Sequence, residues 1–546
     1  MTPSMSEPAA AQTPKTGLQE QLHRLKSFAR SPEARPAVVG ALGAILLTAG
    51  GLGAGSTRLH DPLLESLHLS WLRFGHGLVV SSLLLWTGVA MMLLAWLWLG
   101  RRVIESSVGW RAGAPRPGDV SEYTMLATTG FWLAPLLLSA PLFSRDTYSY
   151  LAQGALLRDG FDPYLVGPIE NVNSLLDNVS PIWTTTTAPY GPAFILIAKF
   201  VTMVVGNDVV AGTMLLRLCM LPGLALLIWA APRVARHVGA SGAAALWIAV
   251  LNPLVIIHLM GGVHNEMLMV GLMMAGIALC FGGRNVAGVT LIAVAVAVKA
   301  TAGLALPFMV WVWARNLRKR RGFAPLKAFT AATVGSLLIF VTVFAVLSLA
   351  AGVGLGWLTA LAGSVKIINW LTVPTAIANL TNVLVGLVVP VNFYAVLETT
   401  RIIGVAVIAI SAPLLWWRYR RTDRDALMGI ALVMAVVVLF VPAALPWYYT
   451  WPLAVVAALA QSRPSIALIA GFSTWITVIW RPDGAHGMYS WTHVLLSSAC
   501  AAGAWYWLYK YRADDDGGVA VSTPSPERGE PPHEPDANAT HRPAGH

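Results

Sequence analysis

One acidic residue, Asp146, stands at the start of a predicted helix in the segment FSRDTYSY, residues 143–150. Leu151 and Ala155 follow with helical spacing, which places the carboxylate at the mouth of that helix. One interpretation is structural, because Ser144 can cap the helix and an acidic group near an N-terminus complements the helix dipole. The other is catalytic, because a carboxylate at an apolar boundary can take a proton from a hydroxyl group when burial raises its basicity.

Two further carboxylates stand in polar segments that interrupt apolar runs. Asp162 lies in the sequence GFDPY, residues 160–164, and an aspartate before a proline is more often a turn former than a base. Glu266 follows the segment GGVHN, residues 261–265, and opens an apolar run. It is either a cap partner at a helix end or a second acidic group of the same site.

Basic residues inside apolar runs are the next candidates. A charged amine or guanidinium group in a membrane is costly unless it reaches the interface or pairs with an anion. Lys299 interrupts the run 286–314, and Arg217 and Arg401 lie about two helical turns inside the ends of their runs. A lipid phosphate is one partner for these cations, and a carboxylate such as Glu398 is the other.

Aromatic residues crowd the segment that follows Pro446, namely Trp447, Tyr448, Tyr449 and Trp451. Such rings form belts at membrane–water interfaces. They also stack on sugar faces or border a prenyl chain, because each has an apolar body and a group that can hydrogen bond. The sequence leaves both interpretations open.

The composition indicates that membrane helices position these residues. The chain has 546 residues, 56% hydrophobic and 12% charged, whereas a soluble domain carries about 25% charged residues. Several apolar runs reach the ~20 residues that cross a hydrocarbon core. The net charge of +11 lies in short clusters between these runs, which argues against a nucleic-acid partner and for cytoplasmic loops in a lipid bilayer. The sequence predicts an all-α, polytopic integral membrane protein.

Alternating the apolar runs under the positive-inside rule predicts about fourteen transmembrane helices and two cytoplasmic termini. The predicted spans lie near residues 38–55, 77–99, 123–142, 209–231, 242–259, 266–283, 328–351, 395–417, 425–442, 447–461, 464–480 and 491–509, with two short helices that bend near Lys299. Residues 143–208 form the main external loop and contain juxtamembrane helices, of which the run 191–206 is interfacial or half-inserted.

The expected organisation has three parts. Residues 1–37 form a cytoplasmic N-terminal segment that can contain an amphipathic helix, because Leu18, Leu22 and Leu25 recur at helical spacing. Residues 38–510 form the transmembrane domain, and residues 511–546 form a disordered cytoplasmic tail. This threading brings the unusual polar and aromatic residues to one membrane face, where they would form a pocket that could serve a lipid-linked substrate.

Several motifs occur together between about residue 125 and residue 510. They are SRDTYSY at 144–150, DPY at 162–164, APYGP at 188–192, NP at 252–253, and His258 with GGVHNE at 261–266. Together they resemble the GT-C superfamily of membrane glycosyltransferases, and more narrowly the actinobacterial polyprenyl-phosphomannose-dependent α-1,6-mannosyltransferases. Glu266 stands where relatives often carry Asp.

The resemblance implies a GT-C-like fold and a mannosyltransferase in the plasma membrane, with its active site on the external, periplasmic face. It implies a polyprenyl-phosphate-mannose donor and a lipid-linked mannan acceptor, joined by α-1,6 linkages in synthesis of a lipomannan or lipoarabinomannan type of backbone. It also implies that Asp146 is the catalytic base.

In this chemistry Asp146 takes the proton of an acceptor hydroxyl, which attacks the anomeric carbon of a β-linked mannosyl phosphate with inversion. The leaving phosphate needs only positive charge, for which the candidates are Lys299, Arg401 and Arg217. The substrate-binding candidates are Tyr148, Tyr150, Asp162, Tyr164, Tyr190, His264, Asn265, Glu266, Trp447 and Tyr448.

No cofactor and no essential metal is expected. Asp146, His264 and Glu266 match no compact ligand motif, and the three cysteines lie apart in apolar runs. The alternative function is a polytopic lipid or sugar transporter or flippase, which often has paired broken helices in two repeats. We find no such repeat in the sequence, and its polar residues gather at one face. A third interpretation is a non-enzymatic scaffold for envelope assembly.

Overall fold

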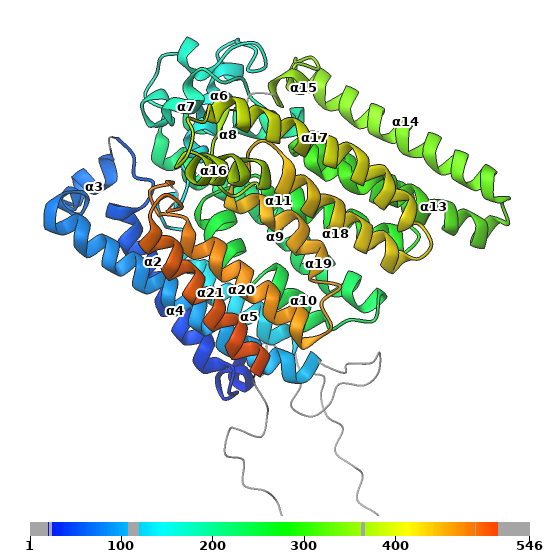
Figure 1. The fold of residues 1–546 in the computed structure, drawn as a ribbon, viewed down its shortest axis with the longest axis horizontal. Helices are drawn as coiled ribbons and strands as arrows, with labels where there is room; N and C mark the ends of the chain where they lie inside the picture. Colours follow the sequence, from blue (N-terminus) through cyan, green and yellow to red (C-terminus); the bar gives the residue numbers. More distant parts are fainter. Residues whose placement is uncertain are drawn as a thin grey trace, which may run out of the picture. The chain divides into compact units, whose positions relative to one another are not determined.

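The structure is a computed structural model that describes residue 20 and residues 25–59, 61–107, 120–361, 366–485 and 487–510. This part of the chain consists of helices joined by turns and loops, without strands (Figure 1). The prediction of an all-α polytopic membrane protein is confirmed. Most of the predicted N-terminal segment 1–37, with Leu18 and Leu22, and the whole predicted tail 511–546 lie outside the described residues.

Among the described residues, five helices are long and apolar enough to cross a membrane. They are α2 (Ala34–Ala54), α4 (Gly75–Ser107), α9 (Val209–His237), α14 (Pro325–Ala351) and α17 (Phe393–Arg418). The pair α10 (Gly242–Ala249) and η4 (Leu254–Gly261) makes a sixth if it is taken as one bent span. The predicted total of about fourteen spans stays a prediction.

The remaining helices are shorter. Those within the predicted spans are α5 (Glu122–Leu136), α11 (Glu266–Phe281), α12 (Asn285–Val298), η5 (Ala300–Ala305), α13 (Leu306–Arg321), α18 (Asp423–Phe440), η7 (Pro446–Tyr449), α19 (Thr450–Val456), α20 (Arg463–Ile479) and α21 (Trp491–Lys510). Those in the polar segments are α3 (Pro62–Ser66), η1 (Ser70–Arg73), α6 (Asp146–Arg158), η2 (Pro168–Glu170), η3 (Leu176–Asn178), α7 (Pro181–Thr184), α8 (Pro192–Val205), α15 (Trp357–Ala360) and α16 (Val373–Val385).

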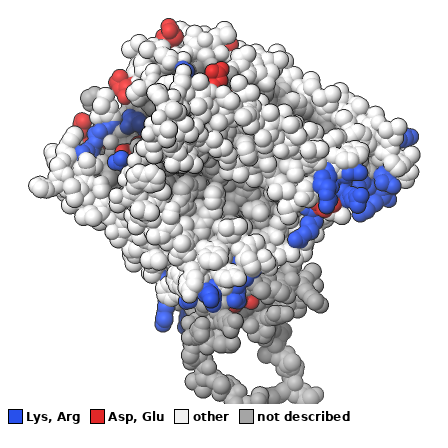
Figure 2. Space-filling model, in the orientation of Figure 1, with Lys and Arg blue, Asp and Glu red and all other residues white. Residues whose placement is uncertain are grey.

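Helices α14 and α17 carry the clearest lipid-facing surfaces. Leu349 is 81% exposed and Ile402 is 63% exposed, although both are large apolar side chains. Figure 2 shows a broad uncharged surface between charged groups at the upper left and groups rich in Lys and Arg at the lower edge and at the right. An apolar surface of this extent is typical of a protein that contacts hydrocarbon, because a soluble protein would leave it facing water.

Ion pairs join the helix ends that carry the basic clusters. Arg236 at the end of α9 pairs with Glu122 at the start of α5. Asp423 at the start of α18 accepts hydrogen bonds from His237 Nε2 at 2.8 Å and from Arg315 Nη2 of α13 at 2.5 Å. These ends therefore lie on one side of the bundle, as the alternation of spans predicted. Whether that side is cytoplasmic stays a prediction.

The opposite helix ends meet around the start of α6. Ser56, after α2, donates its backbone N–H to Pro141 O at 3.0 Å, and Leu142 N lies 3.2 Å from Gly261 O at the end of η4. Phe143 N donates to Pro482 O, after α20, at 3.0 Å. The segment that leads into α6 is thus fixed by backbone hydrogen bonds to three other parts of the chain.

The structure differs from the predicted helices at three places. The predicted span 242–259 is broken and bends by 53°, because Pro253 lacks an N–H and disfavours helical geometry at Asn252. The Asn252 side chain instead accepts a hydrogen bond from Leu254 N and donates one to Ser473 Oγ. The predicted span 447–461 is only the short pair η7 and α19, and the segment 352–394 contains the unpredicted helix α16.

Candidate active site

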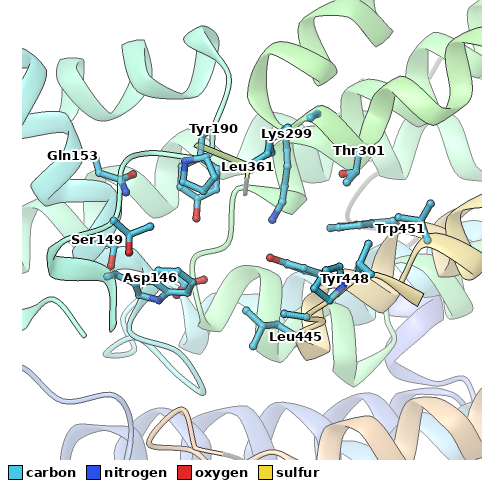
Figure 3. A pocket seen from close by; sticks show the side chains of 18 residues that line it. Asp146, Ser149, Gln153, Tyr190, Lys299, Thr301, Leu361, Leu445, Tyr448 and Trp451 are labelled. Atoms are coloured by element: carbon cyan, nitrogen blue, oxygen red, sulfur yellow. The ribbon is translucent and has the colours of Figure 1, made fainter. Parts of the chain in front are cut away.

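A cavity of about 420 Å³ lies between α6, α7, the break after α12, α18 and the η7–α19 segment. This volume is within the usual range of about 300–1,000 Å³ for small-molecule sites. One side is polar and includes Asp146, Ser149 and Gln153, whereas the other combines Lys299 with aromatic and aliphatic side chains (Figure 3). The other described lining residues are Trp183, Thr186, Pro189, Tyr190, Ala300, Thr301, Leu361, Val437, Val441, Pro442, Ala443, Leu445, Tyr448 and Trp451.

Asp146 is held in place by its neighbours in the chain. Thr147 Oγ1 donates to Gly262 O at 3.0 Å, and Tyr148 OH donates to Ser56 O at 2.6 Å. Phe143 adopts a left-handed backbone with φ 62°, which is uncommon for a bulky residue. Its carbonyl oxygen accepts a hydrogen bond from Trp480 Nε1 at 2.9 Å. These contacts fix the turn that presents the first residue of α6 to the cavity.

The Asp146 carboxyl is buried, and its environment favours proton uptake. Burial, and after it the negative charge of Glu266, raise its pKa from 3.8 to about 7, against the opposing effects of Lys299 and of hydrogen bonds from Ser144 and Trp183. A carboxyl group with this pKa is half ionised near neutral pH. It can therefore accept a proton as a base and release it again.

Lys299 lies at the break between α12 and η5, where the sequence predicted a bend. Its ammonium group pairs with Glu266, the first residue of α11, whose side chain is fully buried. The ammonium also lies 4.4 Å from the centre of the Tyr448 ring and 5.4 Å from that of Trp451. The negative carboxylate and the electron-rich ring faces hold a positive charge against the cavity.

His264 lies behind the two carboxylates in the tight turn between η4 and α11. Its ring stacks on Trp447 with centroids 3.8 Å apart, and its Nδ1 is 3.8 Å from Asp146 Oδ2 and 3.9 Å from Glu266 Oε2. A Cβ atom on Gly262 would lie 2.4 Å from His258 O, so glycine is required at that point of the turn. Asn265 is also fully buried in this turn.

Several predicted site residues support the cavity without facing it. Tyr150 packs edge to face against Tyr190, with ring centroids 5.2 Å apart, and its OH lies 3.4 Å from His264 Nδ1. Asp162 accepts a hydrogen bond from Tyr164 N at 2.8 Å, and Tyr164 OH donates to Tyr190 O at 2.8 Å. Asp162 is thus a turn residue, and this network positions Tyr190.

Three residues that were predicted to contact the substrate or the donor phosphate form hydrogen bonds with backbone carbonyl oxygens outside the cavity. Tyr148 donates to Ser56 O, as described above, and does not line the described cavity. Arg217 is buried and donates to Leu137 O at 2.8 Å and Met260 O at 3.1 Å, so its charge stabilises the ends of α5 and η4. Arg401 donates to Ile367 O at 2.6 Å. Lys299 is the predicted cation that the structure brings to the described cavity wall.

The sequence interpretation missed five polar or aromatic residues of the wall: Ser149, Gln153, Trp183, Thr186 and Thr301. Ser149 and Gln153 follow Asp146 by three and seven positions, so helical spacing alone would have placed them on its face. Thr301 could have been found as a neighbour of Lys299. We see no sequence signal for Trp183, because the loop before α7 returns it to Asp146 only in the folded chain.

The described residues contain no group of three or more His, Cys, Asp or Glu with metal-site geometry. What they contain is a basic carboxylate and a fixed cation on opposite sides of one cavity (Figure 3). This arrangement suits a displacement in which a hydroxyl group loses a proton at Asp146 and an anionic group leaves toward Lys299.

Comparison with known proteins shows the family of the chain. Residues 37–315 match the family model described as alpha-(1→6)-mannopyranosyltransferase, N-terminal domain, and residues 374–510 match the model described as MptB C-terminal domain. The chain is 67% identical to alpha-(1→6)-mannopyranosyltransferase A of Mycobacterium tuberculosis, over 96% of this chain and 99% of the relative. It is 36% identical to the protein of the same name from Corynebacterium glutamicum, over 88% and 99% of the two chains.

A more distant relative, alpha-(1→6)-mannopyranosyltransferase B of Corynebacterium glutamicum, is 30% identical over 82% of this chain and 76% of its own length. The two matched segments include Asp146, Glu266, Lys299 and Tyr448. These four site residues therefore lie within the matched segments, and the chain is a membrane mannosyltransferase that belongs to the α-(1→6)-mannopyranosyltransferase family.

Proposed function

We propose that this protein transfers mannose from polyprenyl-phosphate-mannose to a hydroxyl group of a lipid-linked mannan acceptor, and forms an α-1,6 linkage with inversion at the external membrane face. The observation that carries the proposal is the placement of Asp146 and Lys299 on opposite sides of a cavity of about 420 Å³ (Figure 3). A base for the nucleophile and a cation for the leaving group are then available on either side of a bound sugar.

Each bond change in this reaction has a protein group beside it. The acceptor O–H gives its proton to the Asp146 carboxylate while its oxygen bonds to the anomeric carbon. The bond from that carbon to the phosphate oxygen breaks, and the electron pair leaves with polyprenyl phosphate. Because the phosphate gains negative charge as it departs, the ammonium of Lys299 stabilises the transition state more than the ground state.

Glu266 has two effects on this pair of groups. Its contact with the Lys299 ammonium keeps that charge at the cavity wall, and its own charge raises the pKa of Asp146. Both effects favour the proposed reaction, since one orients the cation and the other makes the base stronger. We therefore assign Glu266 a positioning role behind the two reacting groups.

A lipid donor is supported by the apolar surroundings of Lys299. Thr301 of the cavity wall lies in η5 with Gly303, and Val437 of the wall lies about one helical turn from Val433 along α18. Gly303 and Val433 line a second, largely apolar cavity of about 360 Å³, which Ala412 and Trp416 of α17 also line. A prenyl chain attached to a phosphate at Lys299 would find apolar side chains in this direction.

The external position of the site is supported by charge. Arg236, Arg315 and the neighbouring basic residues lie at the helix ends joined by the Asp423 and Glu122 pairs, and α6 begins among the opposite helix ends. Basic clusters favour the cytoplasmic side. Under that rule both termini are cytoplasmic, residues 38–510 form the catalytic domain, and Asp146 faces outward.

The test is transfer by purified protein from polyprenyl-phosphate-mannose to a short α-1,6-mannoside. We expect Asp146→Asn to lower kcat by at least about 100-fold, since a positioned base contributes about 10²–10⁴. Asp177→Asn, an exposed carboxylate of the same segment, is the matched control and should keep wild-type activity. Unchanged transfer by Asp146→Asn would overturn the proposal.

Thermal stability of Asp146→Asn distinguishes loss of the catalytic base from loss of the folded structure. The pKa of Asp146 is raised in the folded protein, so folding stability falls as pH rises from about 4 to about 7 and the buried group ionises. Asparagine removes this cost of about 1.4 kcal/mol per pKa unit. Asp146→Asn should therefore be at least as heat-stable as the wild type in detergent at pH 8.

A further inference from the structure

Three side chains of α6 form the polar wall of the cavity: Asp146, Ser149 and Gln153. Their spacing of three and four residues places them on one face of the helix. Figure 3 shows this face on the side of the cavity opposite Lys299, Tyr448 and Trp451. The close contact of α6 with α8 fixes the rotation of this face, because a Cβ on Gly154 would lie 2.3 Å from Ala198 O.

Ser149 and Gln153 carry buried polar atoms that have no hydrogen-bond partner within the described part of the chain. Ser149 is 4% exposed and Gln153 is 3% exposed, and the atoms concerned are Ser149 Oγ and Gln153 Oε1. Most buried polar atoms in folded proteins are paired, because an unpaired one costs free energy. Both residues line the cavity, so a ligand in the cavity is the partner in reach.

The direction of the proposed reaction indicates whether Ser149 Oγ and Gln153 Oε1 contact the donor sugar or the acceptor sugar. In a displacement with inversion, the nucleophilic oxygen and the leaving oxygen lie on opposite sides of the anomeric carbon. The phosphate side is marked by Lys299, so the hydroxyl that gives its proton to Asp146 approaches from the α6 side. The ring that carries this hydroxyl must then lie against the wall formed by Ser149 and Gln153.

We infer that Gln153 and Ser149 determine acceptor specificity by hydrogen bonding to ring hydroxyl groups of the acceptor sugar. A glutamine amide offers two donors and an acceptor, and a serine hydroxyl offers one donor and two lone pairs, so together they match neighbouring hydroxyl groups of a hexose. This inference rests on the proposed function, because it uses the direction of transfer between Asp146 and Lys299.

The test compares the wild type with Gln153→Met, which keeps the length of the side chain and removes the amide. Acceptors are a short α-1,6-mannoside and a set of its analogues that each lack one ring hydroxyl. In the wild type, loss of the recognised hydroxyl should lower kcat/KM about tenfold, the usual effect of one hydrogen bond. In Gln153→Met that analogue and the parent should react equally, while the KM for the donor stays unchanged.

Ser149→Ala is a second variant, and it should lose discrimination at a different hydroxyl. Thr301→Val, on the Lys299 side of the cavity, is the matched control and should keep the wild-type pattern across the analogues. A general loss of stability or activity would lower all rates without removing the difference at one hydroxyl, and that result would overturn the inference.

Two other outcomes are also decisive. If the two variants lose discrimination between mannose and deoxy-mannose donors, and keep it between the acceptors, then Ser149 and Gln153 bind the donor and the inference is wrong. If both variants keep the wild-type relative rates across the acceptor analogues, these side chains do not recognise the acceptor, and the inference is wrong. Failure of the wild type itself to transfer mannose would instead reject the proposed function, so the two failures are distinguishable.

Discussion

A carboxylate at a helix start can bind the helix N-terminus or take part in chemistry, and in α6 these two roles fall to different residues. Ser144 Oγ accepts the backbone N–H of Asp146 at 3.1 Å, so the serine satisfies the first N–H of α6. The Asp146 carboxyl itself lies on the cavity wall with a raised pKa. The contact with the backbone N–H is therefore made by Ser144, and the carboxyl group of Asp146 remains available for chemistry.

The proposed base predicts a pH profile with a definite sign. Because Asp146 must be ionised, kcat/KM should rise about tenfold per pH unit below its pKa and level off above about 7. Glu266→Gln removes a charge that raises this pKa, so the acid limb should move to lower pH. Lys299→Met removes a charge that lowers it, so the limb should move to higher pH.

Rate measurements from pH 5 to pH 9 on the three proteins check this prediction. The groups that face Asp146 are Glu266 of α11, Lys299 after α12 and His264 of the preceding turn. His264→Gln serves as the control for a general change of polarity. Shifts of the same sign in the Glu266 and Lys299 variants would contradict the assignment of Asp146 as the titrating base.

At the scale of elements, the turn between η4 and α11 places His264 and Glu266 beside Asp146 and Lys299. This turn depends on close backbone contact at Gly262, where a Cβ would lie 2.4 Å from His258 O and 2.8 Å from Leu142 O. Neither carbonyl belongs to a flexible side chain, so the backbone itself must move to admit a methyl group.

We expect Gly262→Ala to lower thermal stability and to reduce kcat well below that of the wild type, because displacement of the turn moves the groups behind Asp146. Steric strain in a packed interior costs about 1–3 kcal/mol. Gly130→Ala is the matched control: this glycine lies inside α5 with open space around it, so alanine should be neutral or stabilising by about 1 kcal/mol. Melting temperatures and transfer rates of both variants measure the difference.

The cavity between α17 and α18 allows a test of whether the donor is a lipid or a free sugar phosphate. Ala412 lines this apolar cavity of about 360 Å³. Ala412→Trp should fill it and raise KM for a long-chain polyprenyl-phosphate-mannose by about tenfold or more, since each buried CH₂ contributes about 0.8 kcal/mol. A donor with a very short chain should be affected much less.

Ile410→Trp is the control for this substitution, because Ile410 is 62% exposed on the same helix. It adds the same bulk to the outer surface of α17 and should leave the preference for chain length unchanged. Equal effects of Ala412→Trp on long and short donors would place the prenyl chain elsewhere.

At the scale of the whole molecule, the polar contacts sort into two ends of a helical bundle. The Glu122, Arg236, Arg315 and Asp423 pairs form at one end, and the cavity with Asp146 lies near the other. The proposed function requires a cavity that a lipid-linked donor and a lipid-linked acceptor can both reach from the membrane, and a cavity near one end of the bundle is consistent with that requirement.

The predicted orientation can be measured directly by cysteine labelling of intact cells. In a chain whose three cysteines, Cys219, Cys280 and Cys500, are replaced by serine, Val172→Cys should react with a membrane-impermeant maleimide, since Val172 is 84% exposed. Lys319→Cys, at the basic end of α13, should react only after permeabilisation. The reverse pattern would invert the topology and with it the external site.

The amino-acid sequence by itself was sufficient for the helical plan and for part of the site. Apolar runs between basic clusters predicted the positions of most helices, and Lys299 inside such a run predicted the bend between α12 and η5. The length and apolar character of a run are local properties of the sequence, so a membrane helix can be predicted without knowing which helices pack against it. The break at Asn252 and Pro253 was missed although its local cause is visible.

The direction of each polar side chain was decided only by the tertiary structure. Arg217 and Tyr148 looked like substrate contacts, yet their donors are satisfied by carbonyl oxygens of distant segments. Ser149 and Gln153 face the cavity because α6 packs through Gly154 against Ala198 of α8. Helical spacing tells which residues share a face, but the packing of one helix against another determines what that face meets.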